Sequence, residues 1–569
     1  MRIKVLQVAI AVIFLFLAIA LFYFQVIRVN TYQQLSISNC IRLIPQEGIR
    51  GRILDRNGKV IVDSQLSYDV LFFPQENQDL EKTFSKLAQI LGVTAKDLQS
   101  KFKTKGRFAS TPVILVENIG QKKAILIEEF KSELPGVIVQ PQPIRAYPYA
   151  KVAAHILGYL SEIDQWRLDK LQNYGYKSKD MVGYGGVEER YDYFLKAAEG
   201  GLQIEVDNHG RMTKVIGFRP AKSGKDIQLT IDLRIQRIIE DAIGDWKGAI
   251  IVLEPYSGEI LGMASFPNFS PALFLGKSSA KESILRDPGA PLFNRAICGL
   301  YPPGSVFKTI VATAGMDTKK ITTATSFFCS GRIKVGNQEY ECWNVHGEQN
   351  LINAIIHSCN VFFYRLGLLV GPDKIYDYAL RFGLGRATQI DLPQEASGFV
   401  PNPLRKRLRK LKTWFPGDTA NFAIGQGDLL VTPLQVARMM AAIANGSYLP
   451  RPHLIKAVAG REVQTYKKMT GNLNLKTEIL TPLKIGLEGV VMDSSGTANI
   501  LAFPDFSISG KTGTAQVSRG QPHAWFAGFF PTKKPKFTLC VFLEHAGPSY
   551  NACVVARNII EAMKKEGLL

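Results

Sequence analysis

An apolar run opens the chain. Residues 8–24 carry no charged or amide side chain, and the run extends over residues 5–27 if two glutamines are admitted. This length is sufficient to cross the hydrocarbon core of a bilayer. A cleavable signal peptide, the alternative, has a shorter apolar region and a small-residue cleavage site, which "LFYFQVIR" does not offer. Arg2 and Lys4 precede the run, so we expect residues 1–4 in the cytoplasm, residues 5–27 as a single-pass anchor, and the remainder outside the cytoplasm.

The pattern is mixed from the anchor to about residue 225. Alternating apolar residues on both sides of Asn57-Gly58, within residues 50–64, predict a β-hairpin. Apolar stripes at helical spacing predict that residues 82–133 are helical. No paired catalytic groups occur before residue 225, so this segment is predicted to be a spacer and interaction module.

Strand and helix patterns follow one another after Gly224. Residues 226–243 predict a strand running into a helix, and residues 248–266 predict two strands joined at Ser257-Gly258. Further strands are expected in "HAWFAGFF" and "FTLCVFLEHAG", before a last helix in "VVARNIIEAMKKE". We therefore predict an α/β (α+β) domain over residues 226–569, with an antiparallel sheet flanked by helices.

Length and charge set only broad limits. A chain of 569 residues has room for two to four domains, and its formal net charge of +20 suggests anionic surroundings without identifying a partner. The densest basic run, Arg405–Lys412, would suggest nucleic acid in a cytoplasmic protein. Here it is expected outside the membrane, so we predict no nucleic-acid partner and a solvated loop, with contact to anionic lipid or glycan as the alternative.

The first candidate for chemistry is Ser305-Val-Phe-Lys308, which follows Pro302, Pro303 and Gly304. If a helix begins at Ser305, the two side chains share one face and the amine can take the proton of the hydroxyl. Serine needs such a base to become a nucleophile at neutral pH. A lone Ser-x-x-Lys is weak evidence, because this spacing arises by chance in many chains.

Two further motifs follow in chain order. Ser358-Cys359-Asn360 lies in "IIHSCNVFFY", and the residues 511–514 read Lys-Thr-Gly-Thr. Each motif alone is typical of a helix end or of a strand and turn. Together, in this order, they match Ser-x-x-Lys, Ser-Asp-Asn and Lys-Thr-Gly, the signature of penicillin-recognising serine enzymes, with Cys359 at the middle position of the second motif.

The motifs predict a serine acyl-transfer site. Ser305 would attack a carbonyl, Lys308 would accept its proton, and the serine would stay acylated until an acceptor arrives. The backbone N–H groups of Ser305 and Thr514 are candidates for the oxyanion hole. Lys308 must be neutral to act as a base, so we expect a partly dry site with the second lysine nearby.

The remaining motif residues are predicted to relay protons and hold substrate. Ser358 would relay a proton between the lysines and the leaving amine, and Asn360 would orient the substrate. Lys511 would attract a substrate carboxylate. Thr512 and Thr514 would supply hydroxyls, and Gly513 would let the substrate approach the backbone closely.

These motifs, with their surroundings, resemble the class B penicillin-binding proteins, and among them the penicillin-binding protein 2 group, over nearly the full chain. The anchor, "RGRILDRNG", "RAYPYAKVAAHILGYL" and "GVEERYDYFL" resemble that family's elongated pedestal (dimerisation) domain. "FNRAICGLYPPGSVFK", "SCN", "AIGQGDLLVTPLQ" and "KTGTAQV" resemble its transpeptidase domain. The resemblance implies a pedestal over residues 28–225 and a transpeptidase domain over residues 226–569.

The resemblance also implies a function. Members of the group are D,D-transpeptidases that cross-link peptidoglycan stem peptides ending in D-Ala-D-Ala during cell elongation, and β-lactams acylate the residue matched here by Ser305. The implied location is the inner membrane, with the catalytic domain in the periplasm. The implied partners are a RodA-type glycosyltransferase and an MreC-type scaffold.

A possible metal site lies between the first two motifs. Cys329, Cys342, His346 and Cys359 are spaced Cys-x12-Cys-x3-His-x12-Cys. Three thiolates and an imidazole suit a tetrahedral structural zinc ion. Some members of the resembled group hold zinc with carboxylate, histidine and cysteine at matching places, so the first two cysteines would replace carboxylates here. The alternatives are a disulfide between Cys329 and Cys342, or unrelated small core residues.

Three other functions use the same motifs. A β-lactamase would need a base for deacylation, and no convincing Glu-x-x-Leu-Asn occurs in the chain. A β-lactam sensor would need several spans or a cytoplasmic effector domain. An inactive scaffold that keeps the fold should tolerate loss of the nucleophile. A septal, division-type transpeptidase is disfavoured by the cysteine-histidine cluster.

Overall fold

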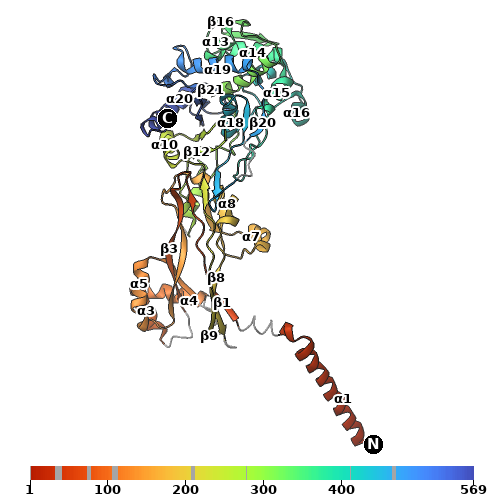
Figure 1. The fold of residues 1–569 in the computed structure, drawn as a ribbon, viewed down its shortest axis with the longest axis vertical. Helices are drawn as coiled ribbons and strands as arrows, with labels where there is room; N and C mark the ends of the chain where they lie inside the picture. Colours follow the sequence, from red (N-terminus) through yellow and green to blue (C-terminus); the bar gives the residue numbers. More distant parts are fainter. Residues whose placement is uncertain are drawn as a thin grey trace. The chain divides into compact units, whose positions relative to one another are not determined.

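The computed structural model describes residues 2–32, 41–72, 79–105, 113–206, 212–276, 279–410, 412–463 and 469–569. These residues form two compact units (Figure 1). The first unit comprises Met1–Gly51, Ser64–Ala146 and Lys196–Lys225, and the second comprises Arg52–Asp63, Tyr147–Leu195 and Asp226–Leu569. The chain therefore passes between the units several times.

The N-terminal apolar run is helical. The α-helix α1 (Arg2–Phe22) continues as a short π-helix, η1 (Tyr23–Ile27), and its side chains are exposed. The 25 residues Ile3–Ile27 have a mean hydropathy of 3.0, so this helix is long and apolar enough to cross a membrane.

Strands and helices build the rest of the described part of the first unit. Strands β1 (Ile41–Gln46), β8 (Gly200–Val206) and β9 (Met212–Arg219) form an antiparallel sheet, and the later part of β3 (Val60–Phe72) pairs with β4 (Val113–Ile119) and β5 (Val137–Ala146). Three helices lie along the chain here: α3 (Leu80–Leu91), α4 (Ala95–Lys105) and α5 (Gln121–Glu129). The apolar stripes thus predicted the helices correctly. The expectation of helix throughout residues 82–133 is wrong at β4, where alternate side chains enter the core formed with Phe72 and Phe84.

The second unit begins with the predicted hairpin, which is confirmed. Strand β2 (Ile53–Leu54) pairs antiparallel with Val60 and Val62 of β3, across Asn57-Gly58. Gly58 has a φ of +84°, the left-handed conformation that this turn requires. Strand β10 (Ile227–Leu229) pairs with β2, β18 (Ile455–Val458) pairs with β10, and β19 (Arg461–Glu462) pairs with β18.

Residues 147–195 form a small substructure of short elements. These are α6 (Ala154–Leu157), β6 (Tyr159–Glu162), α7 (Gln165–Leu171), η4 (Gln172–Tyr174), β7 (Met181–Tyr184), α8 (Gly186–Arg190) and α9 (Asp192–Leu195). Strands β6 and β7 pair antiparallel, and α8 packs against β7.

A five-stranded antiparallel sheet organises the larger part of the second unit. Its order is β12-β11-β23-β22-β21, with β11 (Gly248–Leu253), β12 (Ile260–Phe266), β21 (Ser509–Ala515), β22 (His523–Phe530) and β23 (Phe537–Leu543). Every residue of β11, β22 and β23 is buried, so both faces of the sheet are covered. Helices α10 (Leu233–Ile243) and α20 (Tyr550–Lys565) contact the sheet and each other, and α18 (Pro433–Ala444) also packs on it. The predicted antiparallel sheet and its flanking helices are confirmed.

Helices and small two-stranded sheets occupy the described part of the interval between β12 and β21. The helices are α11 (Ser279–Arg286), α12 (Lys308–Asp317), α13 (Leu351–Ile356), α14 (Asn360–Val370), α15 (Pro372–Arg381), α16 (Pro403–Lys410), α17 (Pro416–Ala423) and α19 (Thr477–Met492). Strand β13 (Ser326–Cys329) pairs with β16 (Gly347–Asn350), β14 (Arg332–Val335) with β15 (Gln338–Glu341), and β17 (Tyr448–Pro450) with β20 (Met469–Asn472).

The basic run at residues 405–412 departs from its prediction. The structure places most of it in helix α16 instead of a loop, while Leu411 lies outside the described residues. Asn402 accepts a hydrogen bond from the backbone of Arg405, and Pro403 occupies the first helical position. Lys406 forms an ion pair with Asp418, which offsets part of the repulsion along the run.

Candidate active site

The nucleophile candidate lies on a tight turn. Ser305 belongs to a 3₁₀ turn, η6 (Gly304–Phe307), and Lys308 begins α12 directly after it. The sequence predicted a helix beginning at Ser305. The observed 3₁₀ turn has three residues per turn, so side chains at i and i+3 are eclipsed, which brings Ser305 and Lys308 to the same side. Gly304 adopts a φ of +57° and its N–H donates to the Gly425 carbonyl.

Lys308 is fully buried and surrounded by acceptors. Its Nζ lies 2.7 Å from the Ser358 carbonyl oxygen, 3.3 Å from Ser358 Oγ and 2.6 Å from Asn360 Oδ1. Burial lowers the pKa of Lys308 to about 8, while the charges of nearby cysteines act in the opposite direction. The amine is therefore closer to neutrality at physiological pH than an exposed lysine, as the base role requires.

The second motif occupies a strained junction between two helices. Ser358 lies between α13 and α14 with a φ of +52°, which is uncommon for a residue with a side chain. Cys359 is the N-cap of α14, with its sulfur accepting from the Phe362 N–H at 3.5 Å, and Asn360 is the first residue of that helix. This geometry buries Ser358 and turns Asn360 toward Lys308, so two motifs 50 residues apart meet at one amine.

The third motif lies on the edge strand of the five-stranded sheet. β21 packs against η6, and a Cβ added at Gly513 would lie 2.9 Å from the Pro303 carbonyl oxygen. Only glycine allows the strand to approach the serine turn this closely. Thr514 is exposed on this strand, and its Oγ1 accepts from the Ser549 N–H at 3.1 Å.

Lys511 and Thr512 are buried more deeply than the sequence suggested. The Lys511 Nζ is fully buried and donates to the Thr512 carbonyl at 3.3 Å. Burial, and then the nearby Lys308, hold the pKa of Lys511 well below its usual range. The charged form that would attract a carboxylate is thus disfavoured until an anion arrives. The Thr512 hydroxyl is bonded to Thr497 Oγ1 at 2.8 Å.

The four candidate metal ligands converge. Cys329, Cys342, His346 and Cys359 offer ligand atoms that all lie within 4.8 Å of one another. The Nδ1 atom of His346 is 3.6 Å from the sulfur of Cys329 and 3.5 Å from that of Cys342. In a tetrahedral site with Zn–S of about 2.3 Å and Zn–N of about 2.0–2.1 Å, the sulfur-to-nitrogen separation is about 3.5 Å. The donor set and its spacing therefore fit zinc, and the alternative disulfide is not formed, because both cysteines are free thiols.

One thiol of the cluster, Cys342, is biased toward the thiolate form that binds cations. A hydrogen bond with Cys359 lowers the pKa of Cys342, with backbone N–H groups contributing, and the same bond raises the pKa of Cys359. The backbone N–H of Asn360 donates to the Cys342 sulfur at 3.1 Å. The cluster thus joins the loop before β16 to the Ser358–Asn360 junction.

Sequence reasoning missed some residues that support the site. Thr497 holds Thr512, and the buried Trp525 donates its indole N–H to the Pro302 carbonyl at 3.1 Å, which fixes the loop before Ser305. His357 bonds Ser495 at 3.0 Å through Nε2, and Ser495 lies in the same loop as Thr497. "DSSGT" reads as an ordinary turn and Trp525 as an ordinary core residue, so no signal in one sequence distinguishes them.

Comparisons with known proteins agree with this geometry. Residues 248–563 match the penicillin binding protein transpeptidase domain, and residues 45–229 match the penicillin-binding protein dimerisation domain. The chain is 31% identical over 577 residues to the peptidoglycan D,D-transpeptidase MrdA of Haemophilus influenzae, covering 95% of this chain and 88% of that protein.

Solved structures show the same fold. The penicillin-binding protein 2 of Helicobacter pylori, in a complex with MreC, superposes with a TM-score of 0.83 at 27% identity, over 93% of this chain and 99% of that one. A chain of a peptidoglycan synthase complex gives a TM-score of 0.75 at 28% identity, over 99% and 98%. With a transpeptidase domain that carries the three motifs, the protein belongs to the penicillin-binding protein family, in the group of the peptidoglycan D,D-transpeptidase MrdA.

Proposed function

We propose that this D,D-transpeptidase of cell elongation uses Ser305 as its nucleophile and Lys308 as the base. Ser305 Oγ attacks the carbonyl of the penultimate D-Ala of a stem peptide, Lys308 accepts the hydroxyl proton, and the terminal D-Ala leaves with a proton. An acceptor amine of a second stem peptide then attacks the ester and releases Ser305. The observation that carries this proposal is the buried Lys308 amine, held 2.6 Å from Asn360 and 2.7 Å from Ser358.

The proposed roles of the other motif residues follow from their positions around Lys308. Ser358, with its hydroxyl 3.3 Å from the Lys308 amine, relays the proton toward the leaving group. Asn360 orients both the lysine and the substrate amide. A substrate carboxylate would raise the lowered pKa of Lys511 and so favour its charged form, which couples binding to the charge state of the site.

Strand β21 then forms the side of the site along which the substrate peptide lies. Gly513 keeps the strand close to the serine, Thr514 presents an exposed hydroxyl and a backbone N–H for the oxyanion, and Thr512 braces the strand through its bond to Thr497. Its place at the sheet edge leaves this strand free to pair with an extended peptide.

Mass spectrometry after penicillin treatment tests the nucleophile. We expect one adduct per chain on the peptide containing Ser305, and none in Ser305→Ala. A stable adduct supports a transpeptidase, whereas rapid turnover of penicillin would indicate a β-lactamase. Failure of Ser305→Ala to support cell elongation would exclude an inactive scaffold, and labelling at another residue would refute the assignment.

We further propose that Cys329, Cys342, His346 and Cys359 hold a structural zinc ion. The ion would supply no catalysis; its coordination would fix the Ser358–Asn360 junction. Elemental analysis is expected to give one zinc per chain, reduced in Cys342→Ser, with a lower melting temperature. Cys540→Ser, a buried cysteine outside the cluster, is the matched control and should keep the metal. Well-folded protein without zinc would rule out the site.

The proposed setting is the bacterial cell envelope. Residues 1–4 lie in the cytoplasm, residues 5–27 anchor the protein in the inner membrane, residues 28–225 form the pedestal, and residues 226–569 form the periplasmic catalytic domain. A relative of known structure was solved with MreC and another in a peptidoglycan synthase complex, so an MreC-type scaffold and a RodA-type glycosyltransferase are the proposed partners. Protease protection of intact spheroplasts, with tags at each end, tests the orientation.

A further inference from the structure

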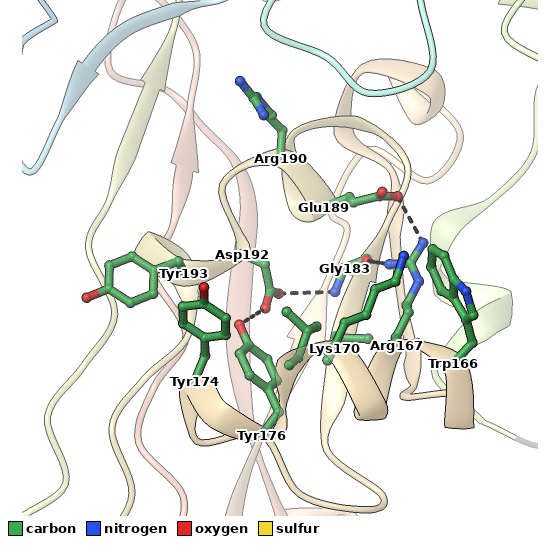
Figure 2. Close-up of a pocket in the computed structure, with 12 residues that line it drawn as sticks. Trp166, Arg167, Lys170, Tyr174, Tyr176, Gly183, Glu189, Arg190, Asp192 and Tyr193 are labelled. Atoms are coloured by element: carbon green, nitrogen blue, oxygen red, sulfur yellow. Dashed lines mark hydrogen bonds and ion pairs between the residues drawn. The ribbon is translucent and has the colours of Figure 1, made fainter.

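A pocket far from the catalytic motifs in sequence lies in the substructure of residues 147–195 (Figure 2). Its volume is about 630 Å³, and its lining is rich in aromatic side chains. Three of these are largely in water: Trp166 is 64% exposed, Tyr174 is 71% exposed and Tyr193 is 76% exposed. Large exposed rings gathered at one hollow mark a binding site more often than a solvated surface.

The walls of the pocket are fixed by internal bonds. Asp192 accepts hydrogen bonds from the Tyr176 hydroxyl and, at 3.1 Å, from the Gly183 N–H. Glu189 accepts from Arg167 at 3.2 Å and from the Gly185 N–H at 2.6 Å. Both acidic groups are therefore committed to holding the backbone and the rings in place, so the pocket is pre-formed.

Two basic side chains that line the pocket, Lys170 and Arg190, are available to bind a ligand. Lys170 lies with its Nζ 3.5 Å from the centre of the Trp166 ring, and Arg190 is exposed. Neither makes an ion pair with any residue in the part of the chain that the structure describes. Figure 2 shows Tyr174 and Tyr193 on one side of Asp192, with Trp166 and Lys170 on the other. A ligand here would contact rings on both sides and meet an excess of positive charge.

We propose that this pocket binds the glycan strand of peptidoglycan, as a second site separate from the catalytic serine. Sugar rings present C–H groups that pack on aromatic faces, and lactyl carboxylates of amino sugars from which the stem peptide has been removed would pair with Lys170 and Arg190. The volume is within the range of sites for ligands of a few rings. The choice of glycan rests on the proposed function, because the polymer that carries the stem peptides is then always near. Holding that polymer at a second point would raise the effective concentration of stem peptides at Ser305.

Binding of defined glycans to the full-length protein in detergent tests the proposal. The probes are peptidoglycan glycan strands freed of stem peptides by an amidase, free stem peptides, and neutral N-acetylglucosamine tetramers. Trp166→Ala and Tyr193→Ala should each weaken strand binding by about tenfold or more, because each removes a ring face. Lys170→Glu should weaken strand binding about fivefold and reduce its salt dependence, with little effect on the neutral tetramer. Trp246→Ala, an exposed tryptophan that does not line the pocket, is the matched control and should bind as wild type.

Penicillin acylation of Ser305, measured on the same samples, separates the two proposals. Normal acylation with wild-type strand binding in all pocket variants would overturn the pocket assignment and leave the catalytic one standing. Absent acylation of folded wild-type protein would overturn the proposed function instead. Loss of binding to a scaffold-protein ectodomain in Trp166→Ala, with strand binding unchanged, would show that the occupant is a protein and would also overturn the glycan assignment.

Discussion

Burial dominates the lowered pKa of Lys308, the proposed base, and its hydrogen bond to Asn360 gives a further prediction with a sign. Asn360→Ala removes the acceptor that lies 2.6 Å from Nζ. Asn360→Asp keeps the shape but places a carboxylate at the same point. We expect the pKa of Lys308 to fall in the first variant and to rise in the second, because the first destabilises the ammonium and the second stabilises it.

The size of the shift follows from the contacts. The wild-type pKa is lowered to about 8, so about a tenth of the enzyme carries a neutral Lys308 at pH 7. A hydrogen bond to a charged group is worth roughly 1.5–3 kcal/mol, and one pKa unit corresponds to about 1.4 kcal/mol. The alanine variant should therefore move the acid limb of acylation down by about one to two pH units. The aspartate variant should move it up by at least a similar amount.

The assay is the second-order rate constant for acylation by a fluorescent penicillin, measured from pH 5 to 10. The neutral fraction of Lys308 increases with pH, so the wild-type rate should rise through about pH 8. Both variants will have a lower plateau if Asn360 also orients the ligand, but a shift of the midpoint in opposite directions in the two variants reports the Lys308 amine. Asn402→Ala, which removes an N-cap asparagine of α16, is a control for general destabilisation and should leave the midpoint unchanged. A midpoint that stays fixed, or shifts in the same direction in both variants, would refute Lys308 as the base.

Three further predictions concern the support of the site. Gly513→Ala should slow acylation by about tenfold or more, because the added Cβ would lie 2.9 Å from the Pro303 carbonyl oxygen. Gly471→Ala is the control: no atom lies within 4 Å of its added Cβ, so the acylation rate should not change. Trp525→Phe should lower the free energy of unfolding by about 1–3 kcal/mol in a denaturant titration, because the Pro302 carbonyl loses its donor; unchanged stability would contradict this. Thr497→Val should slow acylation several-fold by releasing Thr512, and Thr497→Ser should restore the rate; equal rates for both variants would exclude the hydroxyl as the cause.

The spacing of apolar residues was sufficient to predict the regular strands and helices. The prediction failed where tertiary contacts favoured a different structure from the local pattern. The strands β11, β12, β22 and β23 have long apolar runs that only a covered sheet can bury. Strand β4 is flanked by helical patterns and became a strand because β3 offered an edge to pair with. The basic helix α16 depends on the N-cap residue Asn402 and on the ion pair between Lys406 and Asp418. Asp418 lies 12 residues after Lys406, outside the basic run itself.

The sequence by itself determined the local chemistry of this protein. The apolar run fixes a helix long enough to cross a membrane, and a spacing of three places Ser305 and Lys308 on one side of a single turn. Such relations depend only on neighbours along the chain, so one sequence contains them. The candidate metal ligands are recognisable in the sequence by type, but their convergence within 4.8 Å is a property of the fold.

Only the tertiary structure decided which groups act on one another. It brings Ser358 and Asn360, which are 50 and 52 residues from Lys308, to the Lys308 amine. It packs β21 against the turn that contains Ser305. It also buries Lys308 and Lys511, which lowers the pKa of each. It also assembles the aromatic pocket at residues 166–193, whose members share no motif. Burial and approach across long chain separations depend on how the layers pack, and packing is a property of the whole fold that no short pattern records.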